Sequence, residues 1–292
     1  NLLTFFRWGA LNILIANPRD IPALVAELGR QPFTAMTGVN TLFAALLRDP
    51  GFASLDMHTL KVAFGGGMPV QRAVAEQWAS VTGAHLIEGY GLTEASPLVA
   101  GNPLDTEIYT GTVGLPFPST EIKICDDSGK ELALGEVGEI QVRGPQIMQG
   151  YWQQTAETAN VLSADGWLKT GDMGFMDTQG QIKLTDRKKD MIVVSGFKVF
   201  PNEVEEAVIT HPGVLEVAAI GVADDRAGEA VMIVVVRSDD TLTAEALIAH
   251  CRTQLTGYKV PRHVIFSREP LPKTPVGKIL RRLVRSDNQE TS

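Results

Sequence analysis

The chain has 292 residues, of which 44% are apolar and 21% are charged, which is ordinary for a globular protein with one large domain or two. Its net charge of −8 argues against a chain-wide nucleic-acid surface, which needs clustered positive charge. Cys125 and Cys251 stand alone, which excludes a disulfide framework and a zinc pattern and fits a cytoplasmic protein.

The first hundred residues alternate between helical and strand-like patterns. A helix start at Asn17-Pro18-Arg19-Asp20 precedes the first helical segment. Strand, helix, strand, helix indicates a mostly parallel α/β layer. Helices are predicted at 21–30, 41–47 and 70–81, and strands at 33–39, 60–64 and 84–87.

From about Gly111 to Asp186, short strands are broken by Gly and Pro, which indicates a small antiparallel β subdomain. After Asp190 a third unit begins, with Asn202 expected to cap a helix at 203–210 and Thr243 a second one. Three strands complete this α+β unit, and the tail 286–292 is expected to be disordered. The predicted strands are 120–125, 138–143 and 181–185 in the β subdomain, and 214–222, 231–236 and 264–266 in the last unit.

The basic turn TDRKKD at 185–190 lies where the pattern changes, so it is either a surface turn or a hinge between domains. With the hinge interpretation, the chain is an α/β protein with three parts. These are an α/β subdomain (1–110), a small antiparallel β subdomain (111–188) and a C-terminal α+β domain (190–292), with the hinge near 189.

Gly65, Gly66 and Gly67 follow the predicted strand at 60–64. The carboxyl end of a strand in an α/β layer is where ligands usually bind, and glycine lets the backbone approach them closely. The alternative is a tight turn that only packs. No Gly-Lys-Ser/Thr follows, so this is not a Walker phosphate loop.

The segment EGYGLTE at 88–94 places three useful groups within five residues. Tyr90 offers an aromatic face, Thr93 a hydroxyl for a phosphate oxygen, and Glu94 a hard oxygen ligand for Mg²⁺. The set suits a magnesium–nucleotide complex. The alternative is a turn with a solvated glutamate.

Three further side chains are candidates. Asp172, after Thr170-Gly171 in WLKTGD, could accept both ribose hydroxyls or be an ordinary turn aspartate. Arg187 could reach a ribose or phosphate or be solvated. Lys278 lies in the Pro- and Gly-rich PKTPVGKI segment and could act as a mobile point charge.

Two other groups of residues carry weaker expectations. The five histidines are interpreted as structural, and the missing Gly-x-Ser-x-Gly elbow disfavours a serine hydrolase. Three arginines near the end are expected on a solvated helix face, with an anionic partner such as the CoA phosphates as the alternative. They are Arg281, Arg282 and Arg285.

Seven segments in this order resemble the AMP-forming acyl/aryl-CoA synthetase superfamily, which includes firefly luciferase and peptide-synthetase adenylation domains. Within the superfamily, the segments at 15–20 (IANPRD) and 37–43 (TGVNTLF), together with GYWQ and SGFKVFPNEVE, are most similar to bacterial long-chain fatty acyl-CoA synthetases. The segments are GGGMP, EGYGLTE, GEIQVRGPQIMQGYW, WLKTGD, LTDRKKDMIVVSGFKVFPNEVE, LTGYKVP and PKTPVGKIL.

The resemblance implies a role for each candidate. The nucleotide contacts come from Gly65, Gly66 and Gly67 in the adenine and acyl pocket, Tyr90 and its neighbour Gly91 at adenine, Thr93 at the α-phosphate, and Asp172 and Arg187 at the ribose. It further implies that Glu94 binds Mg²⁺, Lys278 is the catalytic adenylation lysine, Lys189 is the hinge and Gly196 borders the pantetheine tunnel.

The resemblance implies a long-chain fatty acid–CoA ligase (AMP-forming) that uses ATP, Mg²⁺ and coenzyme A. It also implies that 1–110 is a partial α/β subdomain that binds nucleotide and acyl group, that 111–188 is a β-barrel-like subdomain and that 190–292 is a mobile domain. The family's Ser/Thr/Gly-rich phosphate loop is not among these residues, and the first residue is Asn1. We therefore expect the chain to be the C-terminal half or so of a synthetase, with exposed sheet edges and apolar faces and little activity by itself.

Two other functions stay open at this point. One is a ligase for aryl, medium-chain or amino acids, or for an acceptor other than CoA. The other is a non-catalytic nucleotide- or acyl-binding fragment. No nucleic-acid partner is expected, and the sequence does not define the oligomeric state. Because long-chain fatty acids partition into bilayers, peripheral association with the inner membrane is an alternative to a purely cytoplasmic location.

Overall fold

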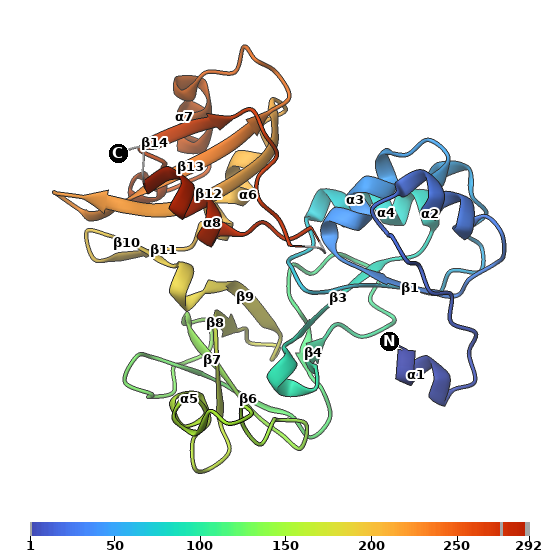
Figure 1. Cartoon of the computed structure of the whole chain (residues 1–292). Coiled ribbons are helices and arrows are strands. Elements are labelled where there is room, and N and C mark those ends of the chain that lie inside the picture. Colours follow the sequence, from blue (N-terminus) through green and yellow to red (C-terminus); the bar gives the residue numbers. More distant parts are fainter. Residues whose placement is uncertain (1, 275–276, 290–292) are drawn as a thin grey trace. The chain divides into compact units, whose positions relative to one another are not determined.

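The computed structural model describes residues 2–274 and 277–289. The prediction of an α/β chain is confirmed, since helices and several sheets alternate along it (Figure 1). The chain divides into two compact units. Unit 1 comprises Asn1–Ile122, Val142–Leu168 and Met176–Lys183, and unit 2 comprises Lys123–Gln141, Lys169–Phe175 and Leu184–Ser292.

Unit 1 contains a five-stranded sheet in the order β1-β2-β3-β4-β5. The first three strands pair in parallel, as the sequence predicts, and the last two are antiparallel. The strands are β1 (Ala35–Gly38), β2 (Val62–Gly65), β3 (Leu86–Gly91), β4 (Leu98–Gly101) and β5 (Leu115–Pro116). The helices before β3 are α1 (Leu2–Arg7), α2 (Ile21–Leu28), α3 (Asn40–Arg48), η1 (Phe52–Ser54) and α4 (Arg72–Thr82).

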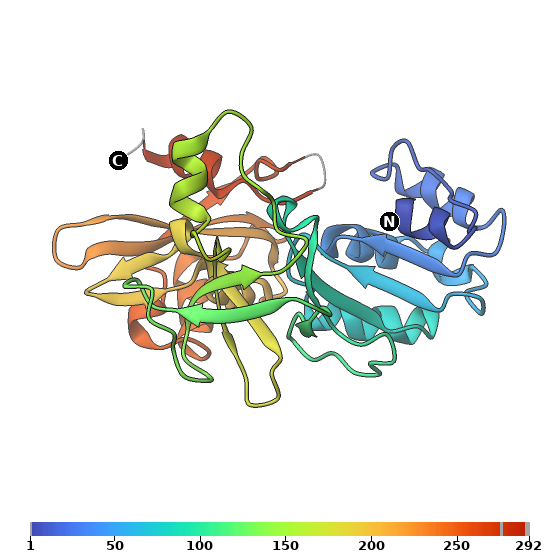
Figure 2. The ribbon, with the colours of Figure 1, turned by 90° about the horizontal axis from the view of Figure 1, so that it is seen from below.

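Local signals explain where these helices begin and end. Asp20 accepts a hydrogen bond from the Ala23 amide (3.1 Å) and so caps α2. Gly83, in the left-handed conformation (φ 71°), ends α4. Figures 1 and 2 show α3 and α4 on one face of the β1–β3 sheet. There Trp78 is fully buried, with its ring 4.8 Å from that of Phe43.

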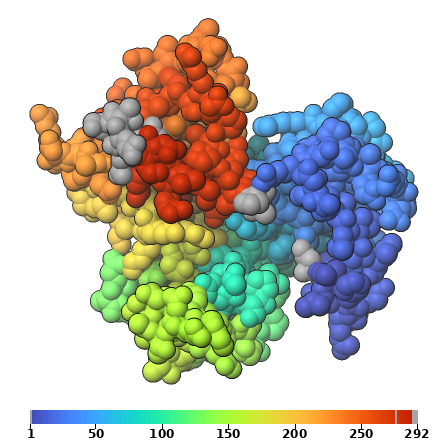
Figure 3. Space-filling view, in the orientation of Figure 1, coloured from blue at the N-terminus to red at the C-terminus, as the bar shows by residue number. Residues whose placement is uncertain are grey.

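The first fourteen residues of unit 1 carry many exposed apolar side chains. The segment is dark blue in Figure 3. Single exposed apolar residues are normal on a surface, but a run of them is not. Those with a large exposed fraction are Leu2, Leu3, Phe6, Trp8, Leu11 and Leu14. The expected exposure of an apolar face is therefore confirmed for this segment.

A four-stranded sheet with the order β6-β7-β8-β9 contributes residues to both units. Strand β8 was not predicted, and Asp172 lies within it, so the alternative of an ordinary turn aspartate is wrong. Gly171 has a positive φ of 72° but remains inside the nine-residue strand. The elements of this region are β6 (Glu121–Cys125), β7 (Gly138–Arg143), α5 (Thr155–Val161), β8 (Leu168–Met176) and β9 (Ile182–Arg187).

Unit 2 also contains a sheet with the order β11-β10-β13-β12, in which β14 pairs in parallel with β13. The other pairings are antiparallel. Its elements are η3 (Lys188–Asp190), β10 (Ile192–Val194), β11 (Phe197–Val199), α6 (Pro201–Ile209), β12 (Val214–Asp224), β13 (Gly228–Arg237), α7 (Ala244–Arg252), η4 (Gly257–Lys259), β14 (His263–Ser267) and α8 (Arg281–Gln289).

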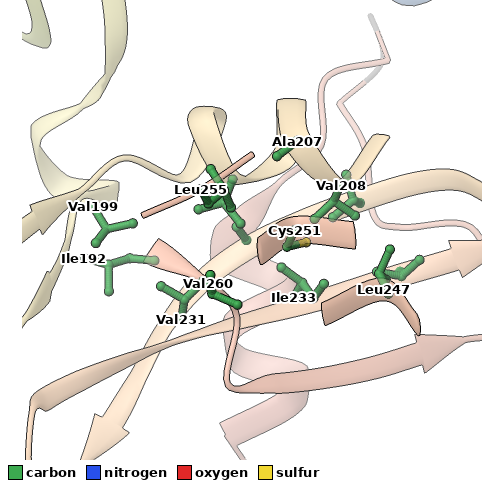
Figure 4. Close-up of a cluster of buried hydrophobic side chains, with 14 of the residues drawn as sticks. Ile192, Val199, Ala207, Val208, Val231, Ile233, Leu247, Cys251, Leu255 and Val260 are labelled. Carbon is green, nitrogen blue, oxygen red and sulfur yellow. The ribbon is translucent and has the colours of Figure 1, made fainter. Parts of the chain in front are cut away.

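Strands β12 and β13 are buried on both faces. Successive side chains of a strand point to opposite faces, so odd- and even-numbered residues join different cores. Val231 and Ile233 pack with Val208 of α6 and Leu247 of α7 (Figure 4). Met232 and Val234 instead pack with residues that include Val284 of α8. The terminal helix α8 is therefore part of the fold of unit 2.

Of three local predictions for unit 2, two are wrong and one is confirmed. The helix α6 begins at Pro201, so Asn202 lies inside the first turn and does not cap it. Thr243 caps α7 as predicted, accepting from the Ala246 amide (3.2 Å). The predicted disorder of 286–289 is wrong because these residues belong to α8, and 290–292 lie outside the described residues. Within the described part of the chain, no helix is long and apolar enough to cross a membrane.

Candidate functional site

The loop after β2 carries the three predicted glycines of unit 1. Gly67 has a positive φ (76°), and a Cβ on Gly65 would come within 2.6 Å of the Val70 side chain. The buried Glu88 fixes the end of this loop by accepting a hydrogen bond from the Val70 amide (3.1 Å). Sequence reasoning assigned Glu88 no role, although its burial next to β2 makes it a support of the loop.

Strand β3 delivers the EGYGLTE segment into the 3₁₀ turn η2 (Thr93–Ala95). A Cβ on Gly91 would lie 2.2 Å from the Pro97 carbonyl oxygen, so glycine is required by this close approach. Tyr90 is only 6% exposed, within the sheet beside Ala100 of β4. Thr93 is exposed. The turn thus displays the threonine, while the tyrosine lies mostly below the surface.

Glu94 is held in place by residues 148–151 within the same unit. The Tyr151 hydroxyl donates to Glu94 Oε1 (2.8 Å), and the Met148 amide donates to the Glu94 carbonyl oxygen (2.8 Å). The hydrogen bond to Glu94 raises the pKa of Tyr151. Tyr151 belongs to the QGYW text of a segment that contributed to the resemblance, but its link to Glu94 was not predicted.

The donor set around Glu94 fits a magnesium ion better than a transition metal. No group of three or more His, Cys, Asp or Glu side chains able to hold a metal occurs among the described residues. Among the same residues, Glu94 Oε2 has no hydrogen-bond partner, while Oε1 is engaged by Tyr151. Mg²⁺ is usually bound by one or two protein carboxylates, and phosphate oxygens and water complete its coordination. The single positioned carboxylate of Glu94 is compatible with such a site.

In unit 2, Asp172 on β8 and Arg187 at the end of β9 approach each other. Asp172 Oδ1 lies 3.6 Å from Arg187 Nε, and the arginine side chain is half exposed. Thr170 fixes the strand by donating to the Ile140 carbonyl oxygen (2.8 Å) and accepting from the Asp172 amide (3.1 Å). The Asp172 carboxylate and the Arg187 guanidinium therefore lie close together on the neighbouring strands β8 and β9.

The charges of Asp172 and Arg187 also act on Lys278. Its loop is closed by Thr274, whose amide donates to the Lys278 carbonyl oxygen (2.8 Å) and whose hydroxyl accepts from the Lys278 amide (3.1 Å). Burial lowers the pKa of Lys278, and Arg187 lowers it further, whereas Asp172 opposes the shift. The charges of Arg187 and Asp172 thus act on Lys278, although the three residues lie far apart in the sequence.

The predicted hinge and tunnel residues also belong to unit 2. Lys189 is exposed within η3. Its neighbour Lys188 is anchored, with Nζ 2.9 Å from Asp127 and 3.0 Å from Glu139. Gly196 has a positive φ (84°) in the turn between β10 and β11, with nothing within 4 Å of an added Cβ. The turn at Gly196 is therefore open on the side where a larger residue would project.

The predicted residues accordingly form two sets, one in each unit. Unit 1 holds Gly65–Gly67, Tyr90, Gly91, Thr93 and Glu94, and unit 2 holds Asp172, Arg187, Lys189, Gly196 and Lys278. The expectation that Arg281 lies on a solvated helix face is wrong, because its side chain is 16% exposed and contacts several carboxylates. Arg282, its neighbour on α8, is exposed as expected.

Two family models match the chain. Residues 1–152 match the model of the AMP-binding enzyme family, and residues 203–278 match the model of the AMP-binding enzyme C-terminal domain. The chain belongs to the AMP-binding enzyme family.

Individual members of the family show which of its proteins the chain is similar to. The chain is 58% identical to a long-chain-fatty-acid–CoA ligase of Yersinia pestis and 56% identical to one of Escherichia coli O157:H7, in each case over 98% of the chain and 51% of the relative. Among solved structures, that of ATP-bound MatB from Rhodopseudomonas palustris is 31% identical, with a TM-score of 0.85 over 93% of this chain and 54% of that one. The chain spans about half the length of the curated relatives it matches.

Proposed function

We propose that these residues are part of a long-chain fatty acid–CoA ligase of the AMP-forming type. The observation that carries the proposal is the pair of Asp172 and Arg187 in unit 2, which lie 3.6 Å apart and whose charges act on Lys278. A lysine cation that interacts with Asp172, the proposed ribose ligand, suits a reaction in which negative charge develops next to a nucleotide. The identity to curated long-chain-fatty-acid–CoA ligases supports the choice of acid and acceptor.

In the first half-reaction, a carboxylate oxygen of the fatty acid attacks the α-phosphorus of ATP. The bond to pyrophosphate breaks, and acyl-adenylate is formed. Asp172 and Arg187 hold the ribose, Tyr90 and Gly65–Gly67 border the adenine, and Lys278 neutralises charge on the reacting oxygens. Thr93 binds the α-phosphate. Glu94 holds Mg²⁺, which supplies further neutralisation of the phosphate charge when bound.

In the second half-reaction, the CoA sulfur attacks the acyl carbon, AMP leaves and the thiol proton passes to solvent. Lys278 has no part in this step. Rotation of residues 190–292 about Lys189 withdraws it and brings Gly196 to the pantetheine tunnel. The division into residues 1–110, 111–188 and 190–292 is part of this proposal. A cytoplasmic location with peripheral access to the membrane suits an acid that partitions into bilayers.

A panel of acids tests the function in the whole protein. Long-chain fatty acids are expected to give the highest kcat/KM for acid-dependent ATP–pyrophosphate exchange and for thioester formation. Pyrophosphate exchange with no CoA thioester would indicate a different acceptor. A preference for aromatic, medium-chain or amino acids would overturn the substrate class. No acid-dependent exchange would leave the non-catalytic binding function.

The pH dependence of the first half-reaction is expected to reflect Lys278. Its pKa in the folded protein lies below the ordinary 10.5, so it loses its proton earlier than a solvated lysine. The adenylation rate should therefore fall as pH rises through that lowered pKa. Over the same interval the unfolded chain binds more protons, so stability rises with pH.

ATP–pyrophosphate exchange as a function of pH measures this alkaline limb without interference from the CoA thiol. Lys278→Arg is the matched variant, because its guanidinium stays protonated throughout. Its residual activity should lose the limb. If the limb is unchanged in Lys278→Arg, another group titrates and the assignment to Lys278 fails.

A further inference from the structure

Arg281, at the start of α8, joins three parts of unit 2. Its Nε and Nη2 contact the two carboxylate oxygens of Glu205 on α6 at 2.7 Å and 2.6 Å. Its Nη1 donates to Asp186 Oδ1 on β9 at 2.9 Å, and Asp190 lies 3.7 Å away. A guanidinium that serves carboxylates from separate elements fixes their mutual geometry more tightly than a lysine would.

The Asp186 carboxylate depends on this arrangement. Its side chain is 1% exposed and accepts from the Arg187 amide (2.8 Å), the Asn202 amide (2.7 Å) and Arg281. Burial opposes the charge of Arg281, but contacts with Glu205, Asp186 and Asp190 outweigh it and raise the pKa. A buried carboxylate that loses its cation is costly, so the Arg281–Asp186 contact favours the arrangement seen here.

The contacts of Arg281 lie on both sides of the proposed hinge. Asp186 precedes Lys189 in the chain and directly precedes Arg187. Glu205 and Arg281 itself follow the hinge, and Arg281 comes three residues after Lys278. The pair with Asp186 therefore spans the hinge, whereas the pair with Glu205 lies entirely beyond it.

We propose that Arg281 is a positioning residue, which holds the Lys278 loop against the strand that carries Arg187 during adenylate formation. The inference rests on the proposed function for the role of Lys278. Rotation about Lys189 separates Arg281 from Asp186, while Arg281 and Glu205 move together. Arg281 thus favours the first half-reaction and must release Asp186 before the second.

The first test uses the 292-residue chain and needs no activity. Trypsin cleaves after lysine and arginine, and Arg187 and Lys189 at the hinge are exposed. Arg281→Gln should raise cleavage at the hinge about 10-fold, since cleavage follows the population of the open form. Arg282→Gln is the matched control on the same helix, and it should leave hinge cleavage unchanged.

A general loosening of unit 2 must be separated from a specific effect at the hinge. Leu247→Ala removes a fully buried side chain of the core beneath α7, away from Arg281. At an equal loss of Tm, Arg281→Gln should give more hinge cleavage than Leu247→Ala. Equal cleavage in the two variants, or none above wild type in Arg281→Gln, overturns the proposal.

The second test separates the half-reactions in the whole protein. Arg281→Gln should slow acyl-adenylate formation about 10- to 100-fold, because a small misplacement of Lys278 is enough for such a loss. Thioester formation from supplied acyl-adenylate should be unchanged or faster. Arg281→Lys, which keeps the charge, should recover part of the first rate. Equal loss of both half-reactions would mean that Arg281 only maintains the fold, and would overturn the proposal.

The two tests also distinguish this inference from the proposed function. If the wild-type whole protein forms no acyl-adenylate with any acid, the proposed function fails. The hinge-cleavage comparison then still decides whether Arg281 fastens the hinge. If adenylate formation is robust and unaffected by Arg281→Gln, the positioning role fails and the proposed function stands.

Discussion

Replacement of Lys278 by alanine is expected to lower acyl-adenylate formation by the whole protein about 10²- to 10³-fold, the usual loss when a charge-stabilising group is removed from a transition state. Lys278 is the lysine on which the charges of Asp172 and Arg187 act. Attack of CoA on supplied acyl-adenylate should be retained, because the proposed rotation about Lys189 withdraws Lys278 before that step. Single-turnover assays of each half-reaction provide the measurement.

Lys273 is the matched control for this prediction. It precedes Lys278 by five residues in the chain, and its ammonium pairs with Glu216 on β12. Lys273→Ala should leave the ratio of the two half-reactions unchanged. If Lys278→Ala reduces both half-reactions to the same extent, the lysine does not act in the first step alone, and the proposed division of labour between the two domain positions is wrong.

Replacement of Glu94 by glutamine should have the second largest effect, a loss of about 10²-fold or more in adenylate formation. Glutamine can still accept the hydrogen bond from Tyr151, so the turn keeps its support while the negative charge is lost. The Mg²⁺ concentration needed for half-maximal rate should rise in parallel. A rate titration with Mg²⁺ at saturating ATP measures both changes.

Tyr151→Phe separates the charge of Glu94 from its position. It removes the hydroxyl that contacts Oε1 but leaves the carboxylate, so we expect a smaller loss than in Glu94→Gln. A binding readout supports the kinetics: Mg–ATP should raise the Tm of the wild type more than that of Glu94→Gln, as expected when a ligand binds only the folded state. A Glu94→Gln protein with an unchanged Mg²⁺ titration would exclude Glu94 as a ligand.

Patterns with a local cause were predicted well from the sequence. The helix after Asp20 and the cap at Thr243 depend on hydrogen bonds between residues three apart, so neighbouring letters are enough. The parallel start of the first sheet follows from alternating segments. Asn202 was misjudged because the helix starts at Pro201, two positions earlier than predicted, and the Asn202 side chain instead donates to the Thr185 carbonyl oxygen.

Features that depend on distant partners were not predictable in this way. Arg281 meets Glu205 and Asp186 at separations of 76 and 95 residues, so its burial leaves no local trace. Strand β8 was missed because Gly171 resembles a turn signal, although strands tolerate a glycine at an irregular point. The link between Tyr151 and Glu94 spans 57 residues and required coordinates.

The exposed apolar side chains of residues 2–14 have a practical consequence. Trp8 and Leu11 have 83% and 80% of their surface in contact with water, and their neighbours Leu3 and Leu14 are similar. Copies of the isolated chain should therefore associate with one another as the protein concentration rises. Light scattering over a dilution series would reveal it, and the digestion experiments belong at the dilute end of that series.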